Sequence, residues 1–256
     1  LDGMQSLNAT LLDGQHANST VPKFMGFERI YQVQQRSGSE VEPEYHVAAC
    51  NFWEDVVGNR TVCIGGNSVS EHFIPAAKGS QYIDNLEGPE SCNSYNMLKL
   101  SEILSDETHD ARYADFYEST MFNHILSTQH PQTGGFVYFT SLRPQSYRIY
   151  STANVSLWCC VGTGWENHSR YAHFIYTRSA DNSTLYVNLF TPSELNADDF
   201  RLTQENSYPE RPSTKITLRK GGRFTLAIRH PWWTTDGYTV KVNGETVAID
   251  VKPGES

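Results

Sequence analysis

The sequence predicts an α + β chain built from two parts, a helical part followed by a smaller antiparallel β part that we expect to be a β-sandwich. The first observation is a change in the spacing of apolar residues, from about 3.6 to 2, near residue 180. The second is the pair Asn243-Gly244, which lies between two alternating runs and is a strong hairpin signal. We therefore expect a helical domain over residues 1–179 and a β domain over residues 180–256.

Five amphipathic segments in the first part predict helices. The fourth is the clearest, because its apolar and aromatic residues follow the i, i+3, i+4, i+7 rule. Pro22 suits the start of the first helix. The five expected helices cover residues 22–35, 41–57, 92–104, 113–125 and 164–177. Paired helices of similar length joined by long loops indicate an α/α toroid or a helical array.

The β part contains alternating runs near residues 185–190, 224–228, 238–242 and 247–251. Such runs, joined by turn residues, are typical of an antiparallel sandwich. The last run ends just before Ser256, so we expect this domain to be incomplete. The chain also begins at Leu1 without a Met or the features of a signal peptide, and we expect it to be the later portion of a longer protein.

Composition excludes several classes of protein. The 256 residues carry 20 Lys and Arg against 29 Asp and Glu, a net charge of −9 that disfavours nucleic acid as a partner. No apolar run approaches the ~18–20 residues of a membrane span, so we expect no membrane partner either. Aromatic residues make up 12% of the chain, too many for a disordered protein. The oligomeric state and the cellular location are left open.

The five cysteines do not indicate a disulfide scaffold, because their number is odd in a chain of this length. Cys50 falls in a helical pattern and Cys63 in a strand-like run over 61–64, and we expect both to be buried small hydrophobes. The adjacent thiols of Cys159 and Cys160 could face one ion. Glu90 and Cys92 could converge from a bent segment.

Three thiolates and a carboxylate suit Zn²⁺, although this spacing is not that of a zinc finger. Glu90 could instead be an acid that favours the N-terminus of a helix. From the residues alone, a zinc site and ordinary packing both stay open.

Two further polar segments carry candidate site residues. Gly65 and Gly66 could adopt φ > 0 and approach a ligand closely, and Glu71 with His72 follows at once, so a proton donor could sit there. The alternative is a tight turn with a solvated glutamate. His16 precedes a helix and could hydrogen-bond a substrate or simply occupy the cap region.

Several of these segments together resemble the β-L-arabinofuranosidases of glycoside hydrolase family 127 and its sister family 146. The resemblance runs over nearly the whole chain, and the run Trp-Cys-Cys-Val-Gly-Thr-Gly at 158–164 is its most specific part. The segments that carry it are residues 16–18, 22–24, 65–73, 90–100, 113–118, 122–126, 150–152, 158–164, 185–190 and 228–232.

The resemblance implies the C-terminal half of an (α/α)₆ toroid catalytic domain, followed by a β-sandwich. It also implies a retaining hydrolase that releases L-arabinose from terminal β-L-arabinofuranosides. Carried over by position, the Zn²⁺ ligands would be Glu90, Cys92, Cys159 and Cys160. Cys159 would also be the nucleophile, Glu71 the general acid/base, and His16 a contact to the sugar, while His72, Tyr95 and Trp158 would line the pocket.

This mechanism is chemically coherent. A thiolate would replace the nucleophilic carboxylate that most retaining glycosidases use. A free cysteine, with a pKa near 8.5, is mostly protonated at neutral pH, and zinc binding removes that proton. Two alternatives stay open: a zinc-stabilised carbohydrate-binding module without turnover, and a glycosidase that pairs Glu71 with another carboxylate. A complete toroid needs more helices than this chain offers, so we expect some sugar-binding residues to lie outside it.

Overall fold

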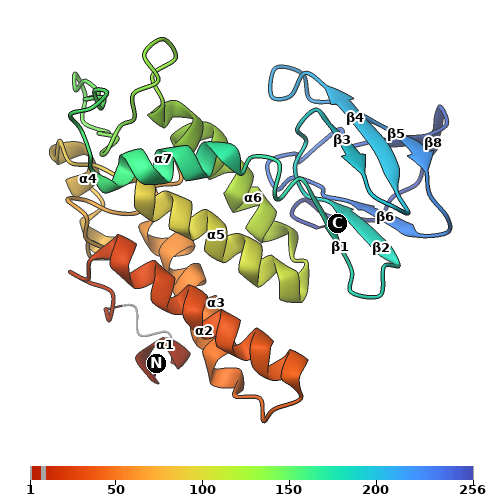
Figure 1. The fold of residues 1–256 in the computed structure, drawn as a ribbon, viewed down its shortest axis with the longest axis horizontal. Helices are drawn as coiled ribbons and strands as arrows, with labels where there is room; N and C mark the ends of the chain where they lie inside the picture. The colour runs from red at the N-terminus through yellow and green to blue at the C-terminus, as the bar shows by residue number, and fades with distance from the viewer. Residues whose placement is uncertain (1, 7–9, 256) are drawn as a thin grey trace. The chain divides into compact units, whose positions relative to one another are not determined.

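The computed structural model describes residues 2–6 and 10–255 and divides into two units (Figure 1). The first unit comprises Leu1–His109 with Phe116–Ser169, and the second comprises Asp110–Asp115 with Arg170–Ser256. The helices are α1 (Asp2–Gln5), α2 (Ala17–Ser37), α3 (Pro43–Asp55), α4 (Gln81–Asp84), α5 (Ser91–Thr108), α6 (Ala111–Thr120) and α7 (Cys159–Ser169). Two π-helical segments, Val56–Arg60 and Met121–Ile125, extend α3 and α6, and short 3₁₀ turns cover Ala76–Lys78 and Leu126–Thr128.

The long helices of the first unit pack around α5. In Figure 1, α2, α3 and α5 lie side by side, and the contacts among them are extensive. The rings of Phe24 on α2 and Phe52 on α3 stack with their centroids 4.0 Å apart. The indole Nε1 of Trp53 on α3 donates a 2.8 Å hydrogen bond to Ser101 Oγ on α5. Most of α5 is therefore buried, its first turn included.

Four of the five predicted helices are confirmed, with shifts of a few residues at their ends. The fifth prediction, 164–177, is wrong at both ends. Helix α7 begins at Cys159 and ends at Ser169, and the residues that follow form a turn that enters the first strand. Phe174 and Ile175 are buried there, so their helical spacing reflects a core turn and not a longer helix.

The second unit is built from short strands in three sheets. The strands are β1 (Tyr176–Arg178), β2 (Thr184–Val187), β3 (Ser193–Asn196), β4 (Arg201–Asn206), β5 (Thr214–Lys220), β6 (Thr225–Ile228), β7 (Val240–Val242) and β8 (Glu245–Val247). Their orders are β1-β2-β6, β3-β4-β5 and β7-β8. All pairs are antiparallel except β2 with β6, which is parallel. This pair corrects the expectation of a wholly antiparallel domain: the chain crosses over through β3, β4 and β5 before β6 joins β2.

The predicted Asn-Gly hairpin is confirmed as the connection between β7 and β8. Asn243 and Gly244 both have positive φ, 52° and 92°, which is the requirement of a type I′ turn. Strands β3, β4 and β5 were not predicted, because they are rich in polar and charged residues and contain few apolar ones. Among the described residues, no helix is long and apolar enough to cross a membrane.

Candidate active site

Four residues that are distant in sequence meet where α5 and α7 begin. Glu90 and Cys92 lie at the start of α5, and Cys159 and Cys160 form the start of α7, which packs against α5 (Figure 1). One ligand atom from each of the four lies within 4.8 Å of all the others. Glu90, Cys92 and Cys160 are buried, and Cys159 is exposed. These four residues are called the Glu-Cys₃ cluster below.

The spacing inside the Glu-Cys₃ cluster fits a single tetrahedral cation. Two sulfurs bound at about 2.3 Å to one tetrahedral zinc lie about 3.8 Å apart. The Sγ atoms of Cys159 and Cys160 are 3.8 Å apart, and Glu90 Oε1 lies 3.7 Å and 3.9 Å from these two sulfurs. The Sγ atoms of Cys92 and Cys160 are closer, at 3.2 Å, yet far outside the ~2.05 Å of a disulfide. All five cysteines are free thiols. The expectation that Cys50 and Cys63 are buried is wrong, because Cys50 is half-buried and Cys63 is exposed in a turn.

The electrostatics of the cluster also favour a cation. Burial, followed by the negative charge of Cys160, raises the pKa of Glu90 to about 8. The Cys92 thiol donates to Cys160, which lowers the pKa of Cys160 to about 7 and raises that of Cys92. Glu90 Oε2 is buried without a hydrogen-bond partner among the described atoms. A divalent cation would offset the cost of burying these anionic groups together.

The backbone before α5 explains why Glu90 points at the cysteines. The residue occupies the N-cap position with extended φ and ψ, but its side chain makes no capping hydrogen bond. Its amide donates to Ser68 Oγ at 3.2 Å, and Thr140 N donates to Pro89 O at 2.9 Å. The interpretation of Glu90 as a simple helix-favouring acid is therefore insufficient, since the carboxylate faces sulfur atoms.

Glu71 is presented by a strained turn. Ser70 and Glu71 have φ values of 44° and 68°, a left-handed conformation that is uncommon for residues other than glycine. Ser70 N donates to Glu87 O, and Ala17 N donates to Glu71 O, both at 2.8 Å. These bonds hold the turn and leave the Glu71 side chain about one-third exposed.

Tyr138 connects Glu71 to the Glu-Cys₃ cluster. Its hydroxyl donates a hydrogen bond to Glu71 Oε1 and also interacts with the Cys159 thiol. Burial and the bond to Glu71 raise the pKa of Tyr138, so the hydroxyl keeps its proton. Sequence analysis missed this residue, because it lies in an irregular segment without helical spacing or a polar motif.

His16 occupies the cap region of α2, one of the two roles that the sequence left open, and its ring also lies beside Glu71. Its Nδ1 accepts a hydrogen bond from Ser19 N at 3.3 Å and so caps α2. Its Nε2 lies 3.5 Å from Glu71 Oε2. The ring of His72 meets that of His16 edge-on, with centroids 5.4 Å apart, and His72 Nδ1 contacts Ser70 O at 2.6 Å. Both histidines therefore lie beside Glu71.

The two remaining aromatic candidates differ in position. The Trp158 ring lies edge-on to Tyr138, with centroids 6.0 Å apart, and its indole Nε1 is buried without a hydrogen-bond partner among the described atoms. Tyr95 is almost fully buried on α5, and the Lys99 ammonium lies over its ring at 4.5 Å. Trp158 thus borders the site, while Tyr95 supports the helix that carries Cys92.

The paired glycines serve a purpose different from the one expected. Gly65 has a φ of 86°, and a Cβ there would lie 2.1 Å from Thr120 Oγ1. A Cβ on Gly66 would lie 2.2 Å from the Pro89 ring. Both glycines therefore approach the protein's own chain closely.

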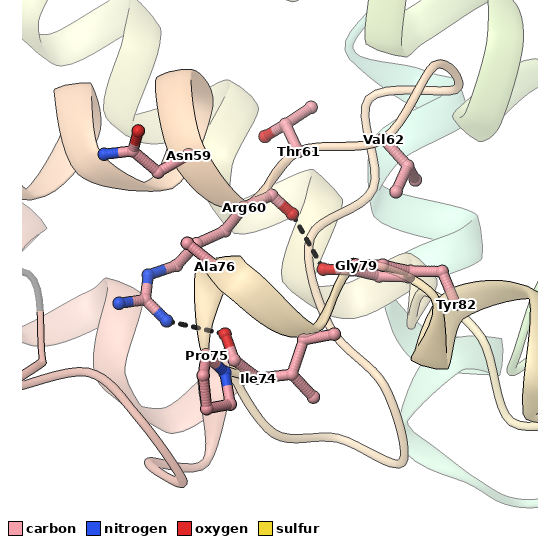
Figure 2. Close-up of a pocket in the computed structure, with 9 residues that line it drawn as sticks. All are labelled: Asn59, Arg60, Thr61, Val62, Ile74, Pro75, Ala76, Gly79 and Tyr82. Carbon is pink, nitrogen blue, oxygen red and sulfur yellow. Dashed lines mark hydrogen bonds between the residues drawn. The ribbon is translucent and has the colours of Figure 1, made fainter.

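A small cavity of about 110 Å³ lies beside the same loop (Figure 2). Its lining residues are Asn59, Arg60, Thr61, Val62, Ile74, Pro75, Ala76, Gly79 and Tyr82. The buried Arg60 donates a hydrogen bond to Ile74 O and forms ion pairs with the carboxylates of Asp13 and Asp55. Tyr82 OH donates to Arg60 O at 2.7 Å, as Figure 2 shows. These bonds make Arg60 a structural anchor of the loop.

Comparison with known proteins places the whole chain in one family. The model of the GH127 β-L-arabinofuranosidase catalytic domain matches residues 4–173, and that of the GH127 middle domain matches residues 184–255. A search of the curated proteins found no match.

Three solved structures share the fold. A GH127 β-L-arabinofuranosidase from Geobacillus stearothermophilus T6 is 20% identical, with a TM-score of 0.70 over 96% of this chain and 40% of its own. A GH127 β-arabinofuranosidase is 24% identical, with a TM-score of 0.73 over 96% and 41%. A further glycoside hydrolase is 20% identical, with a TM-score of 0.73 over 94% and 44%. This chain thus spans less than half the length of these structures, and it belongs to glycoside hydrolase family 127.

Proposed function

We propose that the protein is a zinc-dependent retaining glycoside hydrolase that releases L-arabinose from terminal β-L-arabinofuranosides. The observation that carries this proposal is the convergence of the Glu-Cys₃ cluster, with Tyr138 joining its Cys159 to Glu71. The family, and the printed names of two structural neighbours, support the sugar specificity. We also propose a boundary between catalytic and β domains near residue 180.

Zinc would be held by Glu90, Cys92, Cys159 and Cys160. When bound, Zn²⁺ would convert the thiols to thiolates and hold them in place. Partial desolvation raises the pKa of the Cys159 thiol, so a source of deprotonation is needed at that sulfur.

The exposure of Cys159 supports its assignment as the nucleophile. The other two cysteines of the cluster are buried, with 1% and 0% of their surface accessible, whereas Cys159 is exposed. A sugar can reach one sulfur of the three. Glu71 is likewise partly exposed, and its Oε1 accepts the hydrogen bond from the Tyr138 hydroxyl.

The reaction then follows two displacements. In the first, Cys159 Sγ forms a bond to the anomeric carbon as the glycosidic C–O bond breaks, and Glu71 gives its proton to the departing oxygen. In the second, Glu71 takes a proton from water, the water oxygen bonds to the anomeric carbon, and the C–S bond breaks. Two inversions retain the configuration of the sugar.

The surrounding side chains bind and orient. His16 lies against Glu71, where its Nε2 can contact a sugar hydroxyl, and His72 supports the ring of His16. Trp158 offers an apolar wall next to Cys159, with an indole N–H that has no partner among the described atoms. Tyr95 contributes through the packing of α5.

The second candidate is a zinc-stabilised carbohydrate-binding module without turnover. One observation favours it: the chain spans about two-fifths of its structural neighbours, so part of a sugar pocket could lie outside these residues. In that case the zinc site would hold α5 and α7 together, and Glu71 would bind sugar without transferring a proton.

A pair of cysteine variants tests the proposal. The zinc-loaded chain and its Cys159→Ala and Cys63→Ala variants are assayed for release of L-arabinose from a chromogenic β-L-arabinofuranoside. Cys63 is an exposed cysteine outside the cluster and serves as the matched control. We expect Cys159→Ala to lose activity by at least about a thousandfold, as for other covalent nucleophiles, and Cys63→Ala to keep it.

Equal activity in Cys159→Ala and the wild type would contradict the cysteine mechanism and favour a carboxylate pair. A zinc-loaded wild-type chain that binds L-arabinose but releases none would favour the binding module. Mass analysis supplies a direct check, because the covalent mechanism predicts a glycosylated tryptic peptide over residues 149–170 when turnover is quenched.

A further inference from the structure

The hydroxyl of Thr163, which the proposed reaction does not use, lies beside one sulfur of the Glu-Cys₃ cluster. Thr163 Oγ1 is 3.0 Å from Cys92 Sγ. Cys92 belongs to the first turn of α5, whereas Thr163 lies in α7, so the contact joins two helices. The same sulfur lies 3.2 Å from Cys160 Sγ, also on α7. Cys92 thus contacts α7 through two side chains.

The start of α7 brings Thr163 to this sulfur. Thr163 follows Cys159 by four residues and Cys160 by three, the spacings at which side chains share one face of a helix. The next residue, Gly164, lets α7 approach Phe136 closely, because a Cβ on Gly164 would lie 2.5 Å from that ring. Thr163 therefore lies on the face of α7 that carries both cysteines of the cluster.

The direction of this hydrogen bond follows from the chemistry of the sulfur. A hydroxyl has one proton to donate, and Thr163 Oγ1 lies 3.0 Å from Cys92 Sγ and 3.5 Å from Cys159 O. The contact with sulfur is the shorter one, although sulfur is the larger atom. A metal-bound cysteine has lost its proton, so in a zinc-loaded site the hydroxyl is the donor of this pair. Thr163 is therefore placed to donate to the Cys92 thiolate.

We propose that Thr163 is a positioning residue that holds Cys92 for the metal by donating a hydrogen bond to its sulfur. This inference rests on the proposed zinc site. A hydrogen bond from outside the coordination shell fixes the orientation of a ligand, and its loss typically weakens metal affinity by about 10–100-fold. Cys92 is 1% exposed, which leaves little room for water to take over as the donor. Thr163 would therefore help to determine how tightly this chain holds zinc.

Two competing interpretations give Thr163 a purely structural role. Threonine inside a helix often bonds to the carbonyl four residues earlier, which here is Cys159 O. In that case removing the hydroxyl would leave zinc affinity unchanged. Alternatively, the methyl group of Thr163 fills space between α5 and α7. In that case removing the methyl group would weaken zinc binding, and removing the hydroxyl from an otherwise equal shape would not.

Four variants of the intact chain separate these interpretations. Thr163→Val removes the hydroxyl and keeps the branched shape, whereas Thr163→Ser keeps the hydroxyl and removes the methyl group. Thr163→Ala differs from Thr163→Ser by one oxygen atom, so this pair repeats the comparison if Thr163→Val does not fold. Thr133→Val makes the same exchange at an exposed threonine of the first unit and is the matched control. The zinc affinity of each chain is measured by competition with a chelator of known affinity.

We expect Thr163→Val and Thr163→Ala to bind zinc about 10–100-fold more weakly than the wild type, and Thr163→Ser and Thr133→Val to keep the wild-type affinity. Cobalt-substituted protein supplies a second measurement. A hydrogen bond stabilises the electrons of a thiolate, so its loss should move the sulfur-to-cobalt charge-transfer band to longer wavelength. The band should move in Thr163→Val and Thr163→Ala and stay in place in the other two variants.

Equal zinc affinity in the wild type and in the variants that lack the hydroxyl would overturn the proposal. A Thr163→Ser variant that binds zinc as weakly as Thr163→Ala would also overturn it, because the methyl group would then be the important part. Both results leave the zinc site of the wild type in place and contradict this inference alone. A wild-type chain that holds no zinc would instead contradict the proposed function, and this inference with it.

Discussion

At the scale of single residues, Tyr138 does most to turn a set of buried ligands into a site that could perform chemistry. Its hydroxyl connects the Glu71 carboxylate with the Cys159 thiol, and its ring borders Trp158. On its other side Glu71 faces His16, whose Nε2 lies 3.5 Å from Glu71 Oε2. The relation between the proposed acid and the proposed nucleophile therefore depends on one hydroxyl.

Replacing Tyr138 by Phe should lower kcat by about tenfold, because the ring stays in place while one hydrogen bond to the proposed acid/base is lost, a cost of about 1.4 kcal/mol. Zinc content should not change. Tyr147→Phe removes the hydroxyl of a highly exposed tyrosine and is the matched control. Equal kcat values for Tyr138→Phe and the wild type would exclude this positioning role.

The sequence indicated the ligands but not the residue that links them. Adjacent cysteines between a tryptophan and a glycine-containing segment, together with a Glu-x-Cys pair, left a zinc site and ordinary packing both open. Tyr138 has no such signal, because its role depends on how residues 136–140 run past the start of α5.

At the scale of elements, the candidate site is assembled by loops that are packed tightly against helix ends. Gly65 lies against Thr120 at the end of α6, and Gly66 lies against Pro89 just before α5. This packing fixes the loop that carries Glu71 relative to the helix that carries Cys92. The glycines are thus required by the protein's own chain.

Gly65→Ala should destabilise the chain by about 2–4 kcal/mol, because the new Cβ would overlap Thr120 and because φ is positive at this position. Gly26→Ala is the control, since a Cβ there meets nothing within 4 Å in the middle of α2. That variant should stabilise the chain by about 0.5–1 kcal/mol through helix propensity. Urea unfolding measures the free energy of unfolding of both variants, which should fall in Gly65→Ala and rise in Gly26→Ala. A neutral Gly65→Ala variant would mean that the loop can move away from α6.

A buried histidine joins the same elements. His124, in the π-helical extension of α6, is fully buried and lies 2.8 Å from Ser94 Oγ on α5 and 3.1 Å from Thr140 Oγ1. Burial, assisted by the charge of Arg148, lowers the pKa of His124 to about 3. The folded chain therefore keeps this ring neutral at a pH where the unfolded chain, with a histidine pKa near 6.5, already protonates it.

This difference predicts that the free energy of unfolding decreases as the pH falls from about 6.5 towards 3. Above pH 6.5 the ring is neutral in both the folded and the unfolded chain, so His124 causes no loss of stability there. At pH 5 the contribution of His124 is a loss of about 2 kcal/mol in the free energy of unfolding. His124→Gln should flatten the pH dependence of urea midpoints between pH 7 and 5. His173→Gln, at an exposed histidine, should keep the wild-type slope. Parallel slopes for His124→Gln and the wild type would contradict the assignment.

Helix positions were predictable where a helix buries one periodic face, as α2 does with Ala17, Thr20, Val21, Phe24, Glu28 and Gln32. The start of α7 was not, because the run Cys-Cys-Val-Gly-Thr-Gly has poor helix formers and is stabilised by its contact with α5. The parallel pairing of β2 with β6 was equally hidden, since it joins strands separated by three others. Both features depend on contacts that are distant in sequence.

At the scale of the whole molecule, the change of period near residue 180 predicted the division into a helical and a β part, and the family models match along the same order. The chain covers 40% and 41% of two GH127 structures of the same fold. Activity of this chain therefore depends on whether its own residues suffice for the site. The Glu-Cys₃ cluster, Glu71 and Tyr138 all lie within the first unit.

The central claim is that the Glu-Cys₃ cluster binds one zinc ion, and metal analysis of protein purified without chelators tests it most directly. The account predicts about one zinc per chain, with a sulfur-rich coordination shell in X-ray absorption, and a loss of most of this metal in Glu90→Gln and Cys160→Ser but not in Cys63→Ser. Less than ~0.1 zinc per chain after incubation with zinc and dialysis would contradict the account.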